Sequence, residues 1–133
     1  MDKLTPTQRS KLMARIRSKD TAPELITRKL LYSMGYHYRL HVADLPGCPD
    51  LVFRSRRKVI FVHGCFWHSH SCKAGHLPRS RVDYWSRKLS ANKKRDLKHQ
   101  RELKKGGWTT LVIWECHTKR IQSLERRLVR FLG

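Results

Sequence analysis

Residues 58–72 read K-V-I-F-V-H-G-C-F-W-H-S-H-S-C, and this stretch decides the fold around it. Its first half, from Val59 to Val62, is apolar and β-branched, which predicts a strand buried on both faces. Gly64 then permits a sharp turn of the backbone. The strand ends in a cluster of histidines, cysteines and aromatic residues, which packing alone does not require. We therefore expect a functional site held rigidly at the end of this strand.

The charge of the chain is strongly positive. Thirty Lys and Arg residues stand against ten Asp and Glu residues, which gives a formal net charge of +20 and a pI near 10.7. Such a field attracts polyanions, and nucleic acid is the first candidate. A ribosomal-type protein and a merely solubilising surface are the alternatives. Four tryptophans argue against a disordered basic tail.

The length and hydropathy of the chain limit the class of protein to which it can belong. A chain of 133 residues is most simply a single domain, 1–133, that buries a core without disulfides. It has no run of about 18 apolar residues, so no membrane span is expected. The N-terminal residues lack the apolar segment of a secretory signal. We therefore expect an intracellular, cytoplasmic protein whose cysteines are metal ligands rather than disulfides.

The first half of the chain predicts two helices. Residues 7–18 form either a basic helix that orders only on nucleic acid or an ordinary helix docked by Leu12, Met13 and Ile16. A second helix is expected to begin at Asp20 or Thr21 and to end at Gly35. Its first turn holds Glu24, which the helix N-terminus alone explains. Its expected buried stripe comprises Leu25, Ile26, Leu30 and Leu31.

Strands precede the quoted stretch. Residues 36–42 alternate as a strand, 50–53 begin another, and 55–57 read as a hairpin loop that leads into the strand at 58–62. Antiparallel pairing puts the start of one strand beside the end of the next. Asp50 and His63 occupy those two ends, so we expect them to meet.

The second half predicts a long basic helix at about 82–105, a buried strand at 108–115 and a closing helix at 121–132. The link from 58–62 through the long helix to 108–115 suits a parallel crossover. The order of elements predicts an α/β fold with a mixed central sheet flanked by helices. The inward residues expected in the last helix are Leu124, Leu128, Val129 and Phe131.

Three cysteines and a histidine offer a common tetrahedral zinc set. Three of them come from the loop after the strand and one from the end of 108–115, so a metal ion would tie this loop to the sheet and have a structural role. Reduced, buried cysteines are the alternative. His68 competes as a ligand, and Cys48 lies outside the group. The expected ligands are Cys65, His70, Cys72 and Cys116.

Pro49-Asp50 at the start of a strand is typical of magnesium-dependent nucleases, but the usual acid-x-Lys is replaced by Phe61-Val62-His63. The specific resemblance is to the very-short-patch-repair DNA mismatch endonucleases, and it covers residues 9–130 in the same order. It rests on L-P-G-C-P-D-L-V (45–52), V-I-F-V-H-G-C-F-W-H-S-H-S-C (59–72), W-x-x-K with N-x-x-R-D (85–96), and G-W-x-x-L-V-I-W-E-C (107–116).

The resemblance implies a restriction-endonuclease-like fold and a magnesium-dependent nick on the 5′ side of the T in a T:G mismatch, which arises when 5-methylcytosine deaminates. It implies that Asp50 is the main magnesium ligand, together with the main-chain carbonyl of Val62. It makes His68 the general base that deprotonates water. His63, Glu24 and Asp96 would complete the catalytic site.

The resemblance also implies that the zinc set named above is structural. It matches Phe66, Trp67 and Trp85 to aromatic residues that push into the base stack beside the mismatch, and Met13 to a residue inserted from the other groove. Core packing is the alternative for the aromatic residues, Trp85 above all.

Two positions depart from the family pattern. Val62 stands where threonine is expected, but only its main-chain carbonyl is needed by the metal. Cys48 replaces an arginine beside Asp50, which affects recognition of the DNA context more than catalysis.

The expected protein is a bacterial monomer that acts on mismatched duplex DNA at the nucleoid, with accessory mismatch-repair proteins left open. The rival hypotheses are a restriction-type nuclease on matched duplex and a zinc-stabilised DNA-binding protein without catalysis.

Overall fold

The computed structural model describes residues 20–66, 68 and 81–133. The basic helix expected at 7–18 lies outside these residues. The described elements are α2 (Ala22–Ser33), β1 (Arg39–Leu40), β2 (Leu51–Phe53), β3 (Lys58–His63), α3 (Val82–Lys105), β4 (Thr109–Trp114), the 3₁₀ helix η2 (Glu115–Lys119) and α4 (Ile121–Leu132). None of the described helices is long and apolar enough to cross a membrane.

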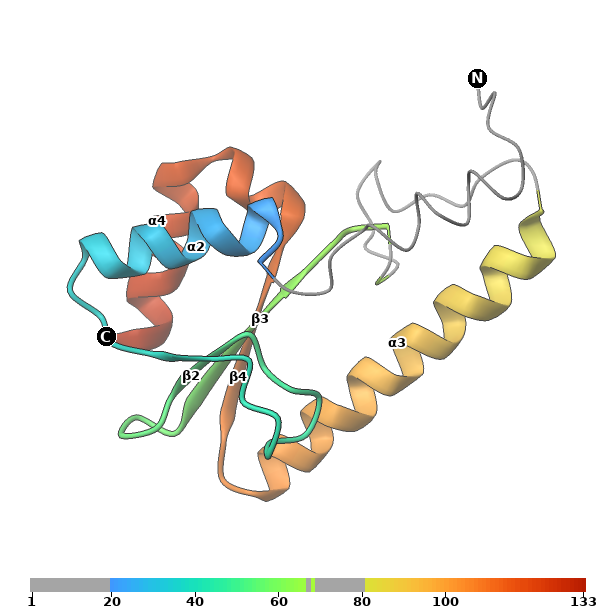
Figure 1. The fold of residues 1–133 in the computed structure, drawn as a ribbon, viewed down its shortest axis with the longest axis horizontal. Coiled ribbons are helices and arrows are strands. Elements are labelled where there is room, and N and C mark those ends of the chain that lie inside the picture. Colours follow the sequence, from blue (N-terminus) through green and yellow to red (C-terminus); the bar gives the residue numbers. More distant parts are fainter. Residues whose placement is uncertain (1–19, 67, 69–80) are drawn as a thin grey trace.

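The four strands form one mixed sheet in the order β1-β2-β3-β4 (Figure 1). β1 with β2 and β2 with β3 pair antiparallel, whereas β3 and β4 pair parallel, with Val62 opposite Ile113. The long helix α3 makes the crossover between the two parallel strands. This confirms the mixed sheet and the crossover predicted from the order of elements.

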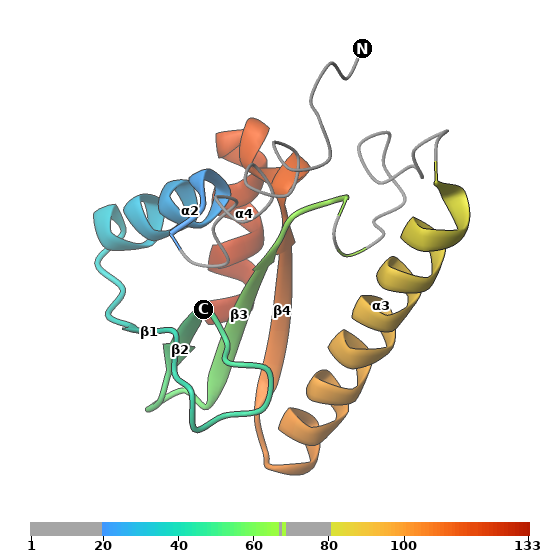
Figure 2. The same cartoon turned by 45° about the vertical axis from the view of Figure 1, so that its right-hand side comes forward.

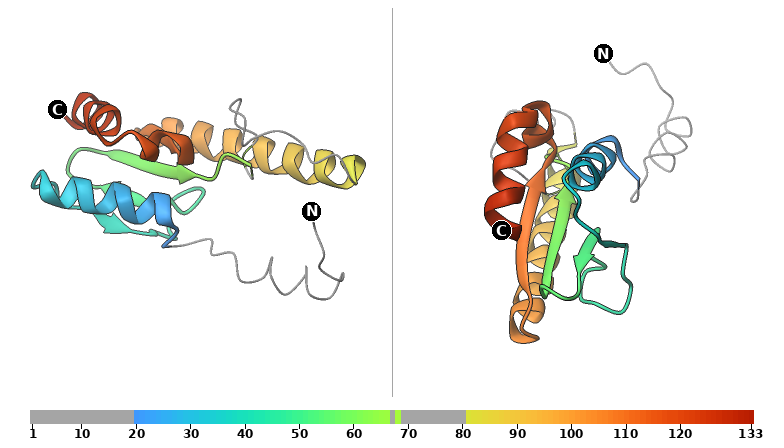
Figure 3. Two further views of the ribbon diagram at one scale, coloured as in Figure 1. Left: turned by 90° about the horizontal axis from the view of Figure 1, so that it is seen from above. Right: turned by 90° about the vertical axis from the view of Figure 1, so that its left-hand side faces the viewer.

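Helices cover both faces of this sheet. Figure 2 shows α2 and α4 on one side of the strands and α3 along the other. The right-hand view of Figure 3 shows the same arrangement from the side, with α3 behind the strands and α2 and α4 in front of them. The alternation of side chains along β3 explains the two layers, because Ile60 packs with α2 and α4 whereas Val59 and Phe61 pack with Leu103 of α3.

The N-terminus of α2 is capped by Thr21, whose hydroxyl accepts a hydrogen bond of 3.4 Å from the N–H of Glu24. The helix ends before Gly35, which has a φ of +85°, as expected for a helix stop. The buried stripe was predicted wrongly at Leu25, which is 38% exposed. Leu31 is buried as expected, and Ile26 and Leu30 pack against the core. The other buried positions are Glu24 and Thr27, so this helix turns two polar side chains inward.

Two further expectations need correction. The strand expected at 36–42 is reduced to two residues, because His41 has a φ of +47° and leaves the extended conformation. In α4, Leu124 and Leu128 are buried as expected, but Val129 is 44% exposed and Leu132 takes the inward position instead. In a helix with 3.6 residues per turn, a shift of one residue rotates the side chain by about 100°, which is enough to move it out of the core-facing stripe.

Candidate active site

Asp50 stands at the start of β2, next to the end of β3. Its carboxylate Oδ2 accepts a hydrogen bond of 2.7 Å from the main-chain N–H of Val62. The antiparallel register, with Leu51 opposite Ile60, brings these two strand ends together. The strand ends therefore adjoin as predicted, although Asp50 bonds to the residue before His63.

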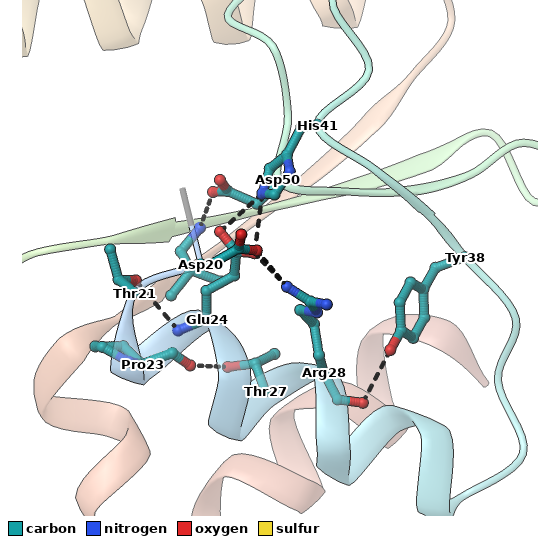
Figure 4. Close-up of polar contacts among 10 residues, drawn as sticks. Asp20, Thr21, Pro23, Glu24, Thr27, Arg28, Tyr38, His41 and Asp50 are labelled. Atoms are coloured by element: carbon teal, nitrogen blue, oxygen red, sulfur yellow. Dashed lines mark hydrogen bonds and ion pairs between the residues drawn. The ribbon is translucent and has the colours of Figure 1, made fainter. Parts of the chain in front are cut away.

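A second carboxylate reaches the same place from α2 (Figure 4). Glu24 is only 1% exposed, and both of its oxygens lie close to Nε2 of His41, at 2.9 and 3.0 Å. Nη1 of Arg28 donates to Glu24 Oε2 at 3.1 Å and to Asp20 Oδ1 at 2.6 Å. The buried carboxylate is thus held by an imidazole and a guanidinium.

Burial raises the pKa of Asp50 to about 7, and the negative charge of Glu24 adds to the rise, while the hydrogen bond from Val62 opposes it. Two carboxyl groups that compete in this way favour a bound cation. Hard divalent cations prefer oxygen ligands. The donor set of Asp50 and Glu24 therefore fits a magnesium ion.

The other expected site residues gather on the α3 side of β3. The rings of His63 and His68 stack with their centroids 3.7 Å apart and their planes 6° from parallel. Nδ1 of His68 is hydrogen-bonded to the carboxylate of Asp96 from α3. His63 is 6% exposed, and none of the described residues forms a hydrogen bond with its Nδ1.

Burial lowers the pKa of His63 to about 4, and the neighbouring His68 contributes to the fall, whereas Asp96 opposes it. His63 is therefore a neutral imidazole at neutral pH. The five expected catalytic residues thus form two groups, Glu24 with Asp50 from the α2 side and His63 with His68 and Asp96 from the α3 side. The end of β3 separates the two groups.

Half of the predicted zinc set lies within the described residues. Cys65 follows β3 and is fully buried, and Cys116 follows β4, the parallel neighbour of β3. The N–H of Cys116 lies 3.4 Å from Sγ of Cys65, so the two cysteines adjoin. His70 and Cys72 lie outside the described residues, and the zinc site stays a prediction.

The predicted aromatic residues are partly described. Phe66 and Trp85 meet edge to face with ring centroids 5.2 Å apart, and Tyr84 packs against Trp85 in the same way. Trp67 and Met13 lie outside the described residues. The contact ties the loop after β3 to the start of α3.

Sequence reasoning missed His41 and Arg28. His41 was assigned to a strand, and nothing in its local pattern indicates a contact with Glu24, which lies 17 residues earlier. Arg28 follows Glu24 by four residues, a spacing that predicts an ion pair on a helix, and this signal was available.

One protein family and three relatives bear on this site. The family described as DNA mismatch endonuclease Vsr matches residues 1–74. The Type II nicking enzyme V.XorIIP of Xanthomonas oryzae pv. oryzae is 52% identical over 131 residues, which cover 98% of this chain and 96% of that protein. DNA mismatch endonuclease Vsr of Escherichia coli is 43% identical over 108 residues, or 81% of this chain and 69% of that protein. The Type II nicking enzyme V.NmeAIP of Neisseria meningitidis is 41% identical over 131 residues, or 98% of this chain and 94% of that protein.

The site combines acidic and histidine side chains at adjoining strand ends, and the chain is strongly basic. Together with these relatives, the site defines a DNA endonuclease. The chain belongs to the Vsr family of DNA mismatch endonucleases. This membership bears out the resemblance drawn from the sequence motifs. It does not agree with the rival hypothesis of a DNA-binding protein without catalysis.

Proposed function

We propose that this endonuclease nicks one strand on the 5′ side of the T in a T:G mismatch and so initiates very short patch repair of deaminated 5-methylcytosine. The observation that carries the proposal is the division of the site around the end of β3. A carboxylate pair that fits a hard cation stands on one side, and a histidine held by a carboxylate stands on the other. A metal site and a general base are the two groups that hydrolysis of a phosphodiester bond requires.

In this proposal Mg²⁺ would be held by Asp50, Glu24 and the main-chain carbonyl of Val62. When bound, the ion polarises the phosphate and neutralises the charge that grows on it in the transition state. The Val62 N–H fixes one oxygen of Asp50, so the orientation of the carboxylate is set before the substrate arrives. A valine side chain at this position leaves both main-chain groups unchanged.

His68 acts as the general base. Its Nδ1 is engaged with Asp96, which leaves Nε2 to accept the proton of the attacking water. The Asp96 carboxylate then stabilises the imidazolium that forms. His63 stacks on the same ring and stays neutral, so no second positive charge opposes protonation of His68.

Recognition of the mismatch falls to the aromatic residues. Phe66 and Trp85 form one packed unit, and together with Trp67 and Met13 they would wedge the base stack open. A mismatch is already weakly paired, so unstacking costs less there than in matched duplex. Zinc on Cys65, His70, Cys72 and Cys116 would hold the loop that carries Phe66.

We further propose that the protein acts as a monomer on chromosomal DNA in the cytoplasm, with accessory repair proteins as candidate partners. Two of the three relatives reported above are named as nicking enzymes and the third as a mismatch endonuclease. We keep cutting of matched duplex as the second candidate function.

Mapping of the cleavage product tests the proposal. Duplexes labelled on either strand carry a T:G pair or a matched pair in several cytosine-methyltransferase contexts, and the protein is added with Mg²⁺. The expected product is a single nick in the T strand immediately 5′ of the mismatched T. Cuts in both strands, or cuts in the matched duplex at the same site, would support the restriction-type alternative instead.

A further inference from the structure

His41 contacts both residues of the carboxylate pair. Its side-chain Nε2 lies 2.9 and 3.0 Å from the two oxygens of Glu24. Its main-chain N–H donates a hydrogen bond of 3.2 Å to the main-chain carbonyl of Asp50. One residue thus bridges α2 and the start of β2, at the point where the two carboxyl groups meet (Figure 4).

The direction of the His41 hydrogen bond follows from the chemistry of its partner. A carboxylate oxygen only accepts hydrogen bonds, so Nε2 must carry the proton and donate it. The imidazole faces both oxygens, and this fixes the rotation of the Glu24 carboxylate as well as its position.

The backbone of His41 is unusual. Its φ of +47° lies in the left-handed region, which residues other than glycine seldom adopt. Such a conformation is strained and persists only where the surrounding structure imposes it. The turn at this residue ends β1 and directs the ring toward α2.

The remaining capacity of Glu24 is limited. An ionised carboxylate offers about four acceptor positions. Two donors already occupy it, since His41 faces both oxygens and Arg28 donates to Oε2 at 3.1 Å. Glu24 also lies within hydrogen-bonding reach of the Asp50 carboxyl group, and its negative charge helps to raise the pKa of Asp50.

We propose that His41 is a positioning residue, which holds the Glu24 carboxylate beside Asp50 so that both present oxygen to one divalent cation. This inference rests on the proposed function of these two carboxylates as the magnesium site. His41 does not touch the cation or the DNA in this account. It acts through Glu24, as residues behind metal ligands commonly do.

Two substitutions with amide side chains test whether the side chain at position 41 must be long enough to donate a hydrogen bond to Glu24. His41→Asn suits the left-handed backbone, since asparagine is enriched there, but its amide is too short to replace Nε2. His41→Gln extends by one methylene and can donate to Glu24 again. His37→Asn, at an exposed histidine of the same segment, serves as the control.

The first measurement is Mn²⁺ binding to the DNA-free protein, read from the electron paramagnetic resonance signal of free Mn²⁺. Substitution behind a metal ligand typically weakens affinity by ~10-fold or more, which is the loss expected for His41→Asn. His41→Gln should recover most of the affinity, and His37→Asn should bind as the wild type does. The Mg²⁺ concentration for half-maximal nicking should shift in the same order.

Equal Mn²⁺ affinity in the wild type and His41→Asn would overturn the inference. Equal losses in His41→Asn and His41→Gln would also overturn it, because reach to Glu24 would then not matter. The proposed function has a separate test. A wild-type protein that binds Mn²⁺ but does not nick T:G duplex would contradict the proposed function. The comparison of Mn²⁺ affinities among the His41 variants would still test the inference.

Discussion

The carboxylate of Asp50 accepts a hydrogen bond of 2.7 Å from the main-chain N–H of Val62. This bond links the start of β2 to the end of β3, so the position of the carboxylate depends on sheet pairing rather than on a flexible loop. The same carboxyl group lies beside Glu24 in surroundings that raise its pKa. Sheet pairing thus holds Asp50 rigidly at a position where its negative charge is unfavourable, and both properties affect stability and activity.

The first prediction concerns stability and pH. The pKa of Asp50 is raised from 3.8 to about 7 in the folded protein, so the neutral carboxyl contributes stability that is complete below about pH 4 and is lost as pH rises to 7. Asp50→Asn lacks this loss. In magnesium-free buffer, its free energy of unfolding relative to the wild type should rise by roughly 2 kcal/mol between pH 5 and pH 8, as denaturant titrations would measure.

The second prediction concerns the base. Asp96→Asn removes the carboxylate that holds Nδ1 of His68 and stabilises the imidazolium. The single-turnover nicking rate should fall by about 100-fold, within the range for loss of general-base catalysis, while the dissociation constant for DNA stays the same. Asp83→Asn, at an exposed acid in the first turn of α3, is the matched control. Equal rates in both variants would remove Asp96 from the mechanism.

The third prediction concerns mismatch recognition. Trp85→Ala should weaken binding to T:G duplex more than binding to matched duplex, because the aromatic unit with Phe66 serves to open the base stack. Fluorescence anisotropy with both duplexes gives the two dissociation constants. Tyr32→Ala, at an aromatic residue 77% exposed on α2, should change neither. A uniform loss on both duplexes would indicate that Trp85 is a packing residue.

The fourth prediction concerns zinc. Cys116→Ser should lower the zinc content of the purified protein and its melting temperature, because Cys116 and Cys65 adjoin at parallel strand ends. Cys48→Ser should retain the metal, since Cys48 lies outside the set. Elemental analysis of both variants is the measurement. Zinc retained in full by Cys116→Ser would contradict the assigned ligands.

The sequence predicts long periodic elements well. The bounds of α3 and α4 and the parallel crossover follow from apolar spacing and glycine positions, and the cluster after β3 stands out by composition alone. The side chains that complete the site were harder to predict. Glu24 looked like an ordinary first-turn carboxylate, and its burial depends on packing against a sheet far along the chain.

His41 shows the same limit at one residue. Its alternating neighbours predict a strand, whereas its left-handed backbone and its contact with Glu24 arise from tertiary structure. Leu25 and Val129 show that periodicity identifies a helix more reliably than the side that faces the core.

The most direct test of the account is the single-turnover nicking rate on T:G duplex and on the matched C:G duplex, with Mg²⁺, for the wild type and for Asp50→Asn. The account predicts a rapid nick of the T:G duplex by the wild type, a far slower reaction on the C:G duplex, and no reaction on either by Asp50→Asn. Equal rates on the two duplexes, or a T:G nick that persists in Asp50→Asn, would contradict it.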